Sequence, residues 1–116
     1  MTLENSQLSI QQDVLRLDKT DHAEISNLLQ RYGLALNFTQ DNTDIPGSFW
    51  GDEEAGLISN QVYARNDTPV HSLLHESCHY ICMDQSRRQS LHTNAGGTAD
   101  EENAVCYLQI LLSKEL

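Results

Sequence analysis

Two histidines four positions apart, with a glutamate directly after the first, lie within the uncharged residues of LLHESCHYI, 73–81. Residues four apart on an α-helix lie about 40° apart around the axis and one turn from each other. His75 and His79 would therefore point their imidazoles at one place in space, as two nitrogen ligands of a tetrahedral zinc ion must. Glu76 lies off the ligand direction, where it can reach a water molecule and take its proton. If these residues bind a metal, the chain must fold so that this helix borders the site.

The residues around this stretch predict a helix inside the protein. Asp67 or Thr68 can cap its start, Pro69 fits its first turn, and the helix would run from Pro69 to about Met83. The side chains that flank the two histidines are uncharged, which suits a buried helix, and a strand candidate precedes it directly. A second interpretation stays open, in which two histidines bracket a glutamate by chance on a helix that binds no metal.

The residues before position 34 indicate an amphipathic helix. Asp21 with Glu24 three residues later forms a capping box, and Gly33 supplies a stop. Apolar side chains between them recur at helical spacing, so we expect a helix over 21–32 that packs on the core. The preceding residues 1–12 are polar, and we expect them to be loosely held.

Three short stretches are strand candidates. LALNFT at 34–39 alternates and carries an aromatic residue, SFW at 48–50 is short, and AGLISNQVYAR at 55–65 is richest in strand-forming residues. The order of helix, strands, helix, loop and helix indicates an α+β domain with a small antiparallel or mixed sheet, rather than alternating βαβ units. The length of 116 residues suits a single domain over 1–116.

A polar connector at 85–97, which ends in two glycines, leads to a C-terminal helix. Thr98 or Asp100 can cap the start of that helix, because both side chains accept hydrogen bonds from the first free amides. The helix is rich in apolar residues that could pack on the core. Those expected to do so are Ala104, Val105, Tyr107, Leu108, Leu111 and Leu112.

The charge balance narrows the classes of function. The chain has 17 acidic residues against 7 lysines and arginines, a formal net charge of -10. That balance argues against nucleic acid or an anionic membrane surface as the main partner, and it favours a bound divalent cation. No run approaches the roughly 18–20 apolar residues that span a membrane. The start MTLENSQLSIQQD has neither the basic patch nor the apolar segment of a secretory signal, so we expect none.

Three cysteines, Cys78, Cys82 and Cys106, form no C-x-x-C pair, and their number is odd. We therefore expect reduced thiols and a cytoplasmic protein. Cys82 lies seven residues after His75, near the stripe of the ligands, and a thiolate there would close a structural zinc site with four protein ligands. Otherwise Cys82 is a small core residue, which is how we interpret the other two cysteines.

Two histidines leave zinc short of a ligand, and the next helix begins with three acidic residues. His71, one turn before His75, either is a partly buried polar residue or lines the site. A loop histidine is a further donor. The candidates for the third ligand are thus Asp100, Glu101, Glu102, His71, Cys82 and His92.

HESCH followed by EENAVCYLQILL resembles the zincin metallopeptidases, and within them the gluzincins. The third ligand of gluzincins is a glutamate on the following helix, often within E-x-x-A, and the residues from Glu101 match that pattern. The resemblance covers roughly residues 55–112. It implies a minimal zincin-like fold in which Zn2+ is bound by His75, His79 and Glu101, with Glu76 as the general base.

One departure from the gluzincin pattern concerns the orientation of a ligand. Many gluzincins carry an aspartate four residues after the third ligand, which orients a ligand histidine, and here that place is Val105. Asp100 or Asn103 could supply the contact instead. The acidic residues also have a simpler interpretation, because Thr98 and Glu101 form a capping box and acids stabilise the first turn of a helix.

Zincins often stabilise the oxyanion of the reaction with His, Tyr or Arg from a segment after the metal-binding helix. We expect His92, between the two helices, to take this catalytic role. Arg87, Arg88, Tyr63 and Tyr107 are also eligible. Each of the five is otherwise an ordinary loop or packing residue.

These residues predict a zinc-dependent metallohydrolase, and by resemblance a metallopeptidase whose substrate is a peptide or protein. Zinc would lower the pKa of a water molecule, and Glu76 would take its proton and pass it to the leaving amine. The strand candidate at 55–65 could pair with an extended substrate, as the edge strand does in zincins. Two alternatives stay open: a zincin-like module that binds zinc without hydrolysis, and a domain with a closed structural zinc site.

Overall fold

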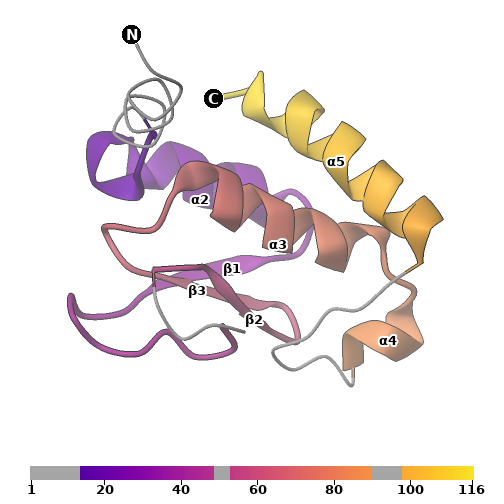
Figure 1. The fold of residues 1–116 in the computed structure, drawn as a ribbon, viewed down its shortest axis with the longest axis horizontal. Coiled ribbons are helices and arrows are strands. Elements are labelled where there is room, and N and C mark those ends of the chain that lie inside the picture. Colours follow the sequence, from indigo (N-terminus) through magenta and orange to yellow (C-terminus); the bar gives the residue numbers. More distant parts are fainter. Residues whose placement is uncertain (1–13, 49–52, 90–97) are drawn as a thin grey trace, which may run out of the picture.

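The computed structural model describes residues 14–48, 53–89 and 98–116. Its elements in chain order are the 3-10 helix η1 (Leu17–Lys19), α2 (His22–Gln30), β1 (Ala35–Phe38), β2 (Gly56–Ile58), β3 (Gln61–Ala64), α3 (Val70–Cys82), α4 (Gln85–Gln89) and α5 (Ala99–Ser113). The sheet lies on one side of the molecule, α3 packs over it, and α5 lies beyond α3 (Figure 1). The expected α+β class is confirmed.

Parts of the sequence prediction lie outside the described residues. They are the loose segment 1–12, the last two residues of the strand candidate 48–50, and the stretch 90–97, which holds His92 and the glycine pair. Within the described ranges, no helix is both long enough and apolar enough to cross a membrane.

Helix α2 begins at the predicted cap. The Asp21 carboxylate accepts hydrogen bonds from the amides of Ala23 and Glu24, at 3.0 and 3.2 Å. The helix ends before Gly33, whose φ of 81° is left-handed and suits glycine. The predicted helix over 21–32 is confirmed with slightly tighter ends. Its buried residues are Ile25, Leu28 and Leu29.

The sheet is mixed, with β3 at its centre. β1 pairs with β3 in parallel, whereas β2 pairs with β3 in the antiparallel sense. The single strand predicted over 55–65 is wrong, because Ser59 and Asn60 turn the chain and divide it into β2 and β3. Ser59 takes a left-handed φ of 51°. Serine and asparagine are common turn residues, so the sequence does indicate a turn between β2 and β3. The strand-forming residues on both sides make that turn hard to recognise.

The turn from β3 into α3 uses its polar residues differently from the prediction. Thr68 Oγ1 accepts a hydrogen bond from the Arg65 amide at 2.9 Å, and the Asp67 carboxylate binds the Arg65 guanidinium at 2.7 and 2.9 Å. Pro69 is the N-cap residue. The predicted cap by Asp67 or Thr68 is therefore wrong. The predicted span, Pro69 to about Met83, agrees with α3 to one residue at each end.

A short N-terminal segment fixes the start of α3. Arg16 and Pro69 form an isolated antiparallel bridge. The Val70 amide donates to the Leu15 carbonyl, and the Leu17 amide donates to the Thr68 carbonyl, both at 2.9 Å. These bonds hold the first turn of α3 in place ahead of its histidine pair.

Helix α3 packs on β2 and β3 on one side and on α5 on the other. Leu73, Leu74 and Cys78 are almost completely buried, in one cluster with Leu57 and Val62 of the sheet. Contact on two sides leaves little of α3 for charged side chains, since burying an unpaired charge is costly. The uncharged flanks of the two histidines follow from this position.

The connector after α3 contains a helix that the sequence analysis does not predict. Helix α4 follows Asp84, whose carboxylate accepts a hydrogen bond from the Arg87 amide at 2.9 Å. An aspartate before a polar run is a capping signal, but a run without apolar periodicity resembles a loop. Part of the predicted connector is therefore one short helix.

Helix α5 begins at the predicted cap, because Thr98 Oγ1 accepts a hydrogen bond from the Glu101 amide at 3.2 Å. Its packing differs from the prediction. Among the six residues expected to pack, Val105 and Leu112 are buried and Leu108 is half-buried, whereas Ala104, Tyr107 and Leu111 are exposed. Apolar residues surround most of this helix, so their spacing does not single out the face that contacts α3.

Candidate metal centre

Helix α3 places His75 and His79 on the side that faces α5. The two ring centroids are 4.9 Å apart and the rings stand edge to face at 80°. The His75 side chain is 35% exposed and the His79 side chain only 6%. The four-residue spacing thus brings the two imidazoles together as predicted, and the pair opens toward solvent at His75.

Glu102 of α5 completes a group of three ligand atoms. Its Oε1 atom lies 3.1 Å from His79 Nε2, and its Oε2 atom lies 3.9 Å from His75 Nε2. One atom from each of the three residues lies within 4.8 Å of the other two. Ligand atoms of a tetrahedral zinc ion are about 3.3 Å apart, so small side-chain movements would let this group hold one ion.

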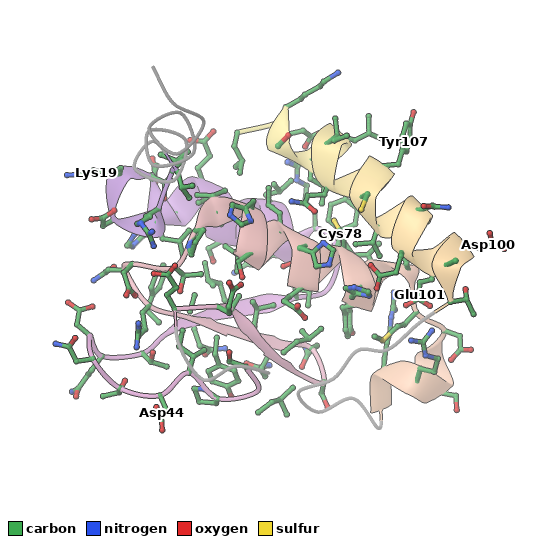
Figure 2. The ribbon with its side chains drawn as sticks, viewed as in Figure 1. Lys19, Asp44, Cys78, Asp100, Glu101 and Tyr107 are labelled. Carbon is green, nitrogen blue, oxygen red and sulfur yellow. The ribbon has the colours of Figure 1, made fainter. Side chains whose placement is uncertain are left out.

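Glu101, the third ligand predicted from the sequence, has a different set of contacts. Both of its carboxylate oxygens bind the Arg87 guanidinium of α4. This bond is the main reason that the pKa of Glu101 lies below its usual value. Figure 2 shows Glu101 on the side of α5 toward α4, with Asp100 at its outer side. The structure therefore brings Glu102, rather than Glu101 or the exposed Asp100, into the group of ligand atoms.

The donor atoms present fit a divalent metal ion. His79 Nδ1 is buried and has no hydrogen-bond partner in the described part of the chain. Glu101 Oε1 lies 3.5 Å from that nitrogen without forming a hydrogen bond to it. A histidine that binds a metal through Nε2 keeps its proton on Nδ1 and directs it at an acceptor such as this carboxylate. Two imidazoles and one carboxylate are a common ligand set of catalytic zinc.

Glu76 follows His75 on α3 and is half-buried. Burial raises the pKa of its carboxyl to about 7, while His75 lowers that pKa and Glu54 and Glu102 raise it. These interactions put Glu76 within electrostatic reach of the group of ligand atoms. A carboxyl whose pKa lies near neutrality can both accept and return a proton in that range.

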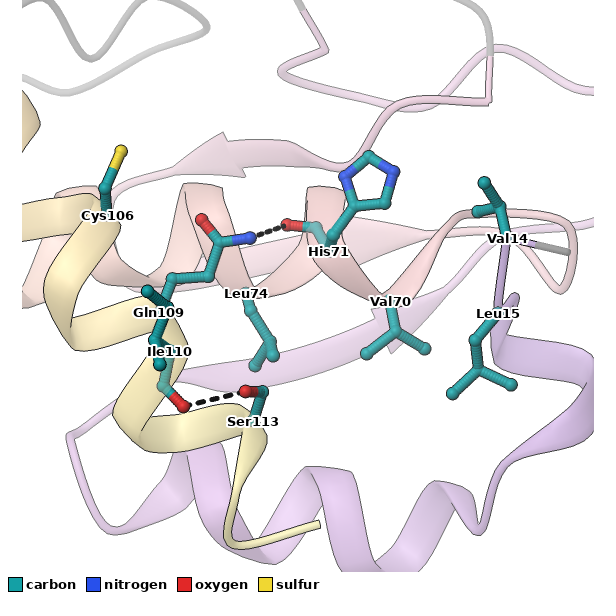
Figure 3. Close-up of a pocket in the computed structure, with 9 residues that line it drawn as sticks. All are labelled: Val14, Leu15, Val70, His71, Leu74, Cys106, Gln109, Ile110 and Ser113. Atoms are coloured by element: carbon teal, nitrogen blue, oxygen red, sulfur yellow. Dashed lines mark hydrogen bonds between the residues drawn. The ribbon is translucent and has the colours of Figure 1, made fainter. Parts of the chain in front are cut away.

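Gln109 is a site residue that the sequence analysis misses. Its Oε1 atom lies 3.1 Å from His75 Nδ1. Its Nε2 atom donates to the His71 carbonyl at 3.1 Å (Figure 3). The sequence predicts Asp100 or Asn103 for this contact, but both are exposed and Gln109 contacts His75 instead. The available signal is the spacing: Gln109 lies seven residues, or about two turns, after Glu102 on α5.

The other residues proposed for the site are spread around it. Arg88 binds the carbonyls of Tyr80 and Ile81 at the end of α3 and stacks over the Tyr80 ring. Tyr63 is half-buried on β3, and Tyr107 is 67% exposed on α5. His92 lies outside the described residues. The oxyanion-stabilising role therefore stays a prediction.

The burial of the three cysteines and of His71 agrees only partly with the prediction. Cys78 is buried as predicted, and burial raises the pKa of its thiol to about 12, so it is a core residue. Cys106 is exposed, so its prediction as core is wrong. Cys82 is half-buried and does not belong to the group of ligand atoms in the described chain. His71 is exposed rather than partly buried.

A groove of about 520 Å³ runs beside the metal centre, between α3, α5 and the N-terminal segment (Figure 3). Its walls are largely apolar, with Leu15, Leu74 and Ile110 among the lining residues. His71 and Gln109 also line it. Because Gln109 contacts both the groove and His75, the groove is next to the candidate ligands.

Comparison of the chain with protein-family models, with curated proteins and with solved structures gives no match.

Proposed function

We propose that the protein is a zinc-dependent metallohydrolase and, by its resemblance to the gluzincins, a metallopeptidase. The observation that carries this proposal is the convergence of ligand atoms from His75, His79 and Glu102 within 4.8 Å of one another, with Glu76 directly after His75 on α3. Three protein ligands with room for a fourth, non-protein ligand are typical of catalytic zinc. The partial exposure of His75 supplies the access that a substrate needs.

We assign the third ligand to Glu102 in place of Glu101. The carboxylate of Glu102 faces the Nε2 atoms of both histidines, whereas that of Glu101 is bound to Arg87. Glu101 then has a supporting role, because its carboxylate lies beside His79 Nδ1. Relative to the E-x-x-A pattern, the ligand moves by one residue, and Val105 takes the place of the alanine.

The chemistry follows from the position of Glu76. Zinc, when bound here, would polarise a carbonyl group and make a water molecule more acidic. Glu76 would take the proton of the water as its oxygen attacks the carbonyl carbon, and would pass that proton to the leaving amine as the C–N bond breaks. Burial favours this proton transfer, because it stabilises the protonated carboxyl relative to the charged form.

We propose a peptide or protein as the substrate, with its apolar side chains in the groove. The edge strand β2 is less accessible, because the outward Leu57 amide donates to the Gly47 carbonyl at 3.3 Å. The Ala55 amide beside it donates to Ser72 Oγ at 3.0 Å. An extended substrate could pair with β2 only if residues 46–48 moved aside. The groove needs no such movement and reaches Gln109 beside His75.

Glu76→Gln tests the proposed mechanism. Metal content is measured by elemental mass spectrometry, and hydrolysis is measured on a peptide library by mass spectrometry. We expect about one zinc per chain in the variant and a rate that falls roughly 100- to 10,000-fold. Asp100→Asn is the matched control, because it neutralises an exposed acid at the start of α5, and it should keep both zinc and activity.

The same measurements separate the proposal from its alternatives. If Glu76→Gln hydrolyses peptides at the wild-type rate, the proposed mechanism is wrong. If the unmodified protein binds zinc but cleaves no peptide at any pH, the fold is a binding module. If chelation of the zinc unfolds the chain rather than only stopping hydrolysis, the zinc is structural.

A further inference from the structure

We propose that Gln109 is a positioning residue for the metal centre, which holds His75 in the one tautomer that can bind a metal through Nε2. This inference rests on the proposed metal site but not on peptide hydrolysis. Gln109 is on α5, the helix that also carries Glu102, and its amide lies between the His75 ring and the first turn of α3.

The hydrogen bonds of the Gln109 amide fix its orientation. The His71 carbonyl can only accept a hydrogen bond, so the atom of the amide that lies 3.1 Å from it must be the NH2 group. The amide oxygen then faces His75 Nδ1, also at 3.1 Å. If the amide were reversed, its oxygen would face the oxygen of the His71 carbonyl, and neither atom could donate a hydrogen bond.

This orientation decides where the proton of His75 lies. The amide oxygen is an acceptor only, so Nδ1 must carry the proton to form the bond. In a neutral imidazole the other nitrogen, Nε2, then holds the lone pair. That nitrogen is the one directed at Glu102, with Oε2 3.9 Å away. The ring therefore presents its metal-binding atom to the centre before any ion arrives.

The contact also links the position of α5 to the metal centre. Gln109 and Glu102 lie two turns apart on one face of α5, so a single helix supplies a ligand and the group that orients another ligand. An amide carries no charge, unlike a carboxylate in the same place. Gln109 thus fixes the orientation of the ring without raising the basicity of His75 as strongly as a carboxylate would.

Three variants test the role of Gln109. Gln109→Leu removes the acceptor with little change in volume, Gln109→Glu restores an acceptor, and Asn103→Leu makes the same kind of change at an exposed position of α5. Affinity for Zn2+ alone is measured by competition with a chromophoric chelator. The tautomer of His75 is measured by nitrogen NMR of the metal-free protein at alkaline pH, where imidazole is neutral. Circular dichroism verifies that each variant folds.

We expect Gln109→Leu to weaken zinc binding by roughly 10- to 100-fold and to lose the preference for a proton on Nδ1 of His75. Gln109→Glu should keep the proton on Nδ1 of His75, because a carboxylate oxygen still accepts there although the bond to the His71 carbonyl is lost. Asn103→Leu should match the unmodified protein. The inference is overturned if folded Gln109→Leu keeps the Nδ1-protonated tautomer. It is also overturned if that variant binds zinc as well as the unmodified protein does. The tautomer measurement needs no zinc and no activity, so it decides the role of Gln109 even if the proposed hydrolysis fails.

Discussion

The two histidines of the candidate centre lie one turn apart on α3, yet α5 surrounds them differently. Both direct Nε2 at the Glu102 carboxylate. His75 Nδ1 is bonded to a neutral amide at 3.1 Å, and its side chain is 35% exposed. His79 Nδ1 lies 3.5 Å from a carboxylate without a hydrogen bond, and its side chain is 6% exposed. A hydrogen bond thus orients one imidazole, whereas burial and nearby charge hold the other.

This difference extends to the residues around each histidine. At the His75 end, Gln109 and the groove provide orientation and access. At the His79 end, Arg87 holds Glu101 beside the ring and so links α4 to α5 through one ion pair. The open end suits the approach of a substrate, and the closed end suits the retention of an ion.

Removing either histidine should weaken zinc binding, but only one removal should affect folding strongly. His75→Ala and His79→Ala each delete a ligand, so we expect zinc affinity to fall by roughly 100-fold or more in both. His79→Ala also leaves a cavity at a buried position and should lower the free energy of unfolding of the metal-free protein by about 2 kcal/mol. His75→Ala should lower it by less than about 1 kcal/mol. Urea unfolding that gives equal losses for the two variants would contradict the comparison.

Arg87→Met should change stability and zinc affinity in opposite directions. Without the guanidinium, the Glu101 carboxylate lacks the counter-charge that now binds both of its oxygens, so the metal-free protein should unfold at a lower urea concentration. The loss of a positive charge beside the centre should strengthen the binding of a cation by roughly severalfold. Urea unfolding and chelator competition measure the two effects.

Arg88→Met is the matched control for that experiment. Arg88 binds the carbonyls of Tyr80 and Ile81 at the end of α3 rather than the acids of α5. We therefore expect its zinc affinity to change less than that of Arg87→Met. Weaker zinc binding in Arg87→Met would contradict the prediction. It would show that the positioning of Glu101 by Arg87 affects zinc affinity more than the repulsion between Arg87 and the ion does.

The smallest effect should come from Asp67, in the turn before α3 at the His75 end. The hydrogen bond from Arg65 lowers the pKa of this half-exposed carboxyl below 3.8. A lowered pKa in the folded state stabilises the protein above the unfolded value, and this contribution disappears as the pH falls through the folded value. Asp67→Asn should therefore cost less than about 1 kcal/mol at pH 7, and nothing in strong acid. A cost that is equal at both pH values would contradict this cause.

The sequence predicts α3 and its histidine pair well because one pattern carries several consistent signals. The spacing of His75 and His79 sets their common face, and the uncharged flanks reflect contact with the sheet and α5. The predicted N-cap residue of α3 was wrong, but the span of the helix does not depend on which residue is the N-cap. The mixed sheet was less predictable, because the turn at Ser59 and Asn60 lies between strand-forming residues.

The α5 half of the centre could not be predicted to the residue. Glu101 and Glu102 point about 100° apart around the helix axis, so the choice between them depends on how α5 is rotated against α3. The apolar residues around most of α5 do not encode that rotation, and exposed Tyr107 and Leu111 have the same character as buried Val105. The contact between Gln109 and His75 depends on the same rotation of α5 against α3. The role of Gln109 therefore becomes visible only when the two helices are placed together.

Zinc stoichiometry, measured side by side by elemental mass spectrometry for the unmodified protein, Glu102→Ala and Glu101→Ala, decides whether Glu102 is the third ligand. About one zinc per chain should be bound by the unmodified protein. The zinc should be lost in Glu102→Ala and kept in Glu101→Ala, since Glu101 supports His79 without binding the ion. The opposite pattern, or an unmodified protein that binds no zinc, would contradict the metal centre described for these two helices.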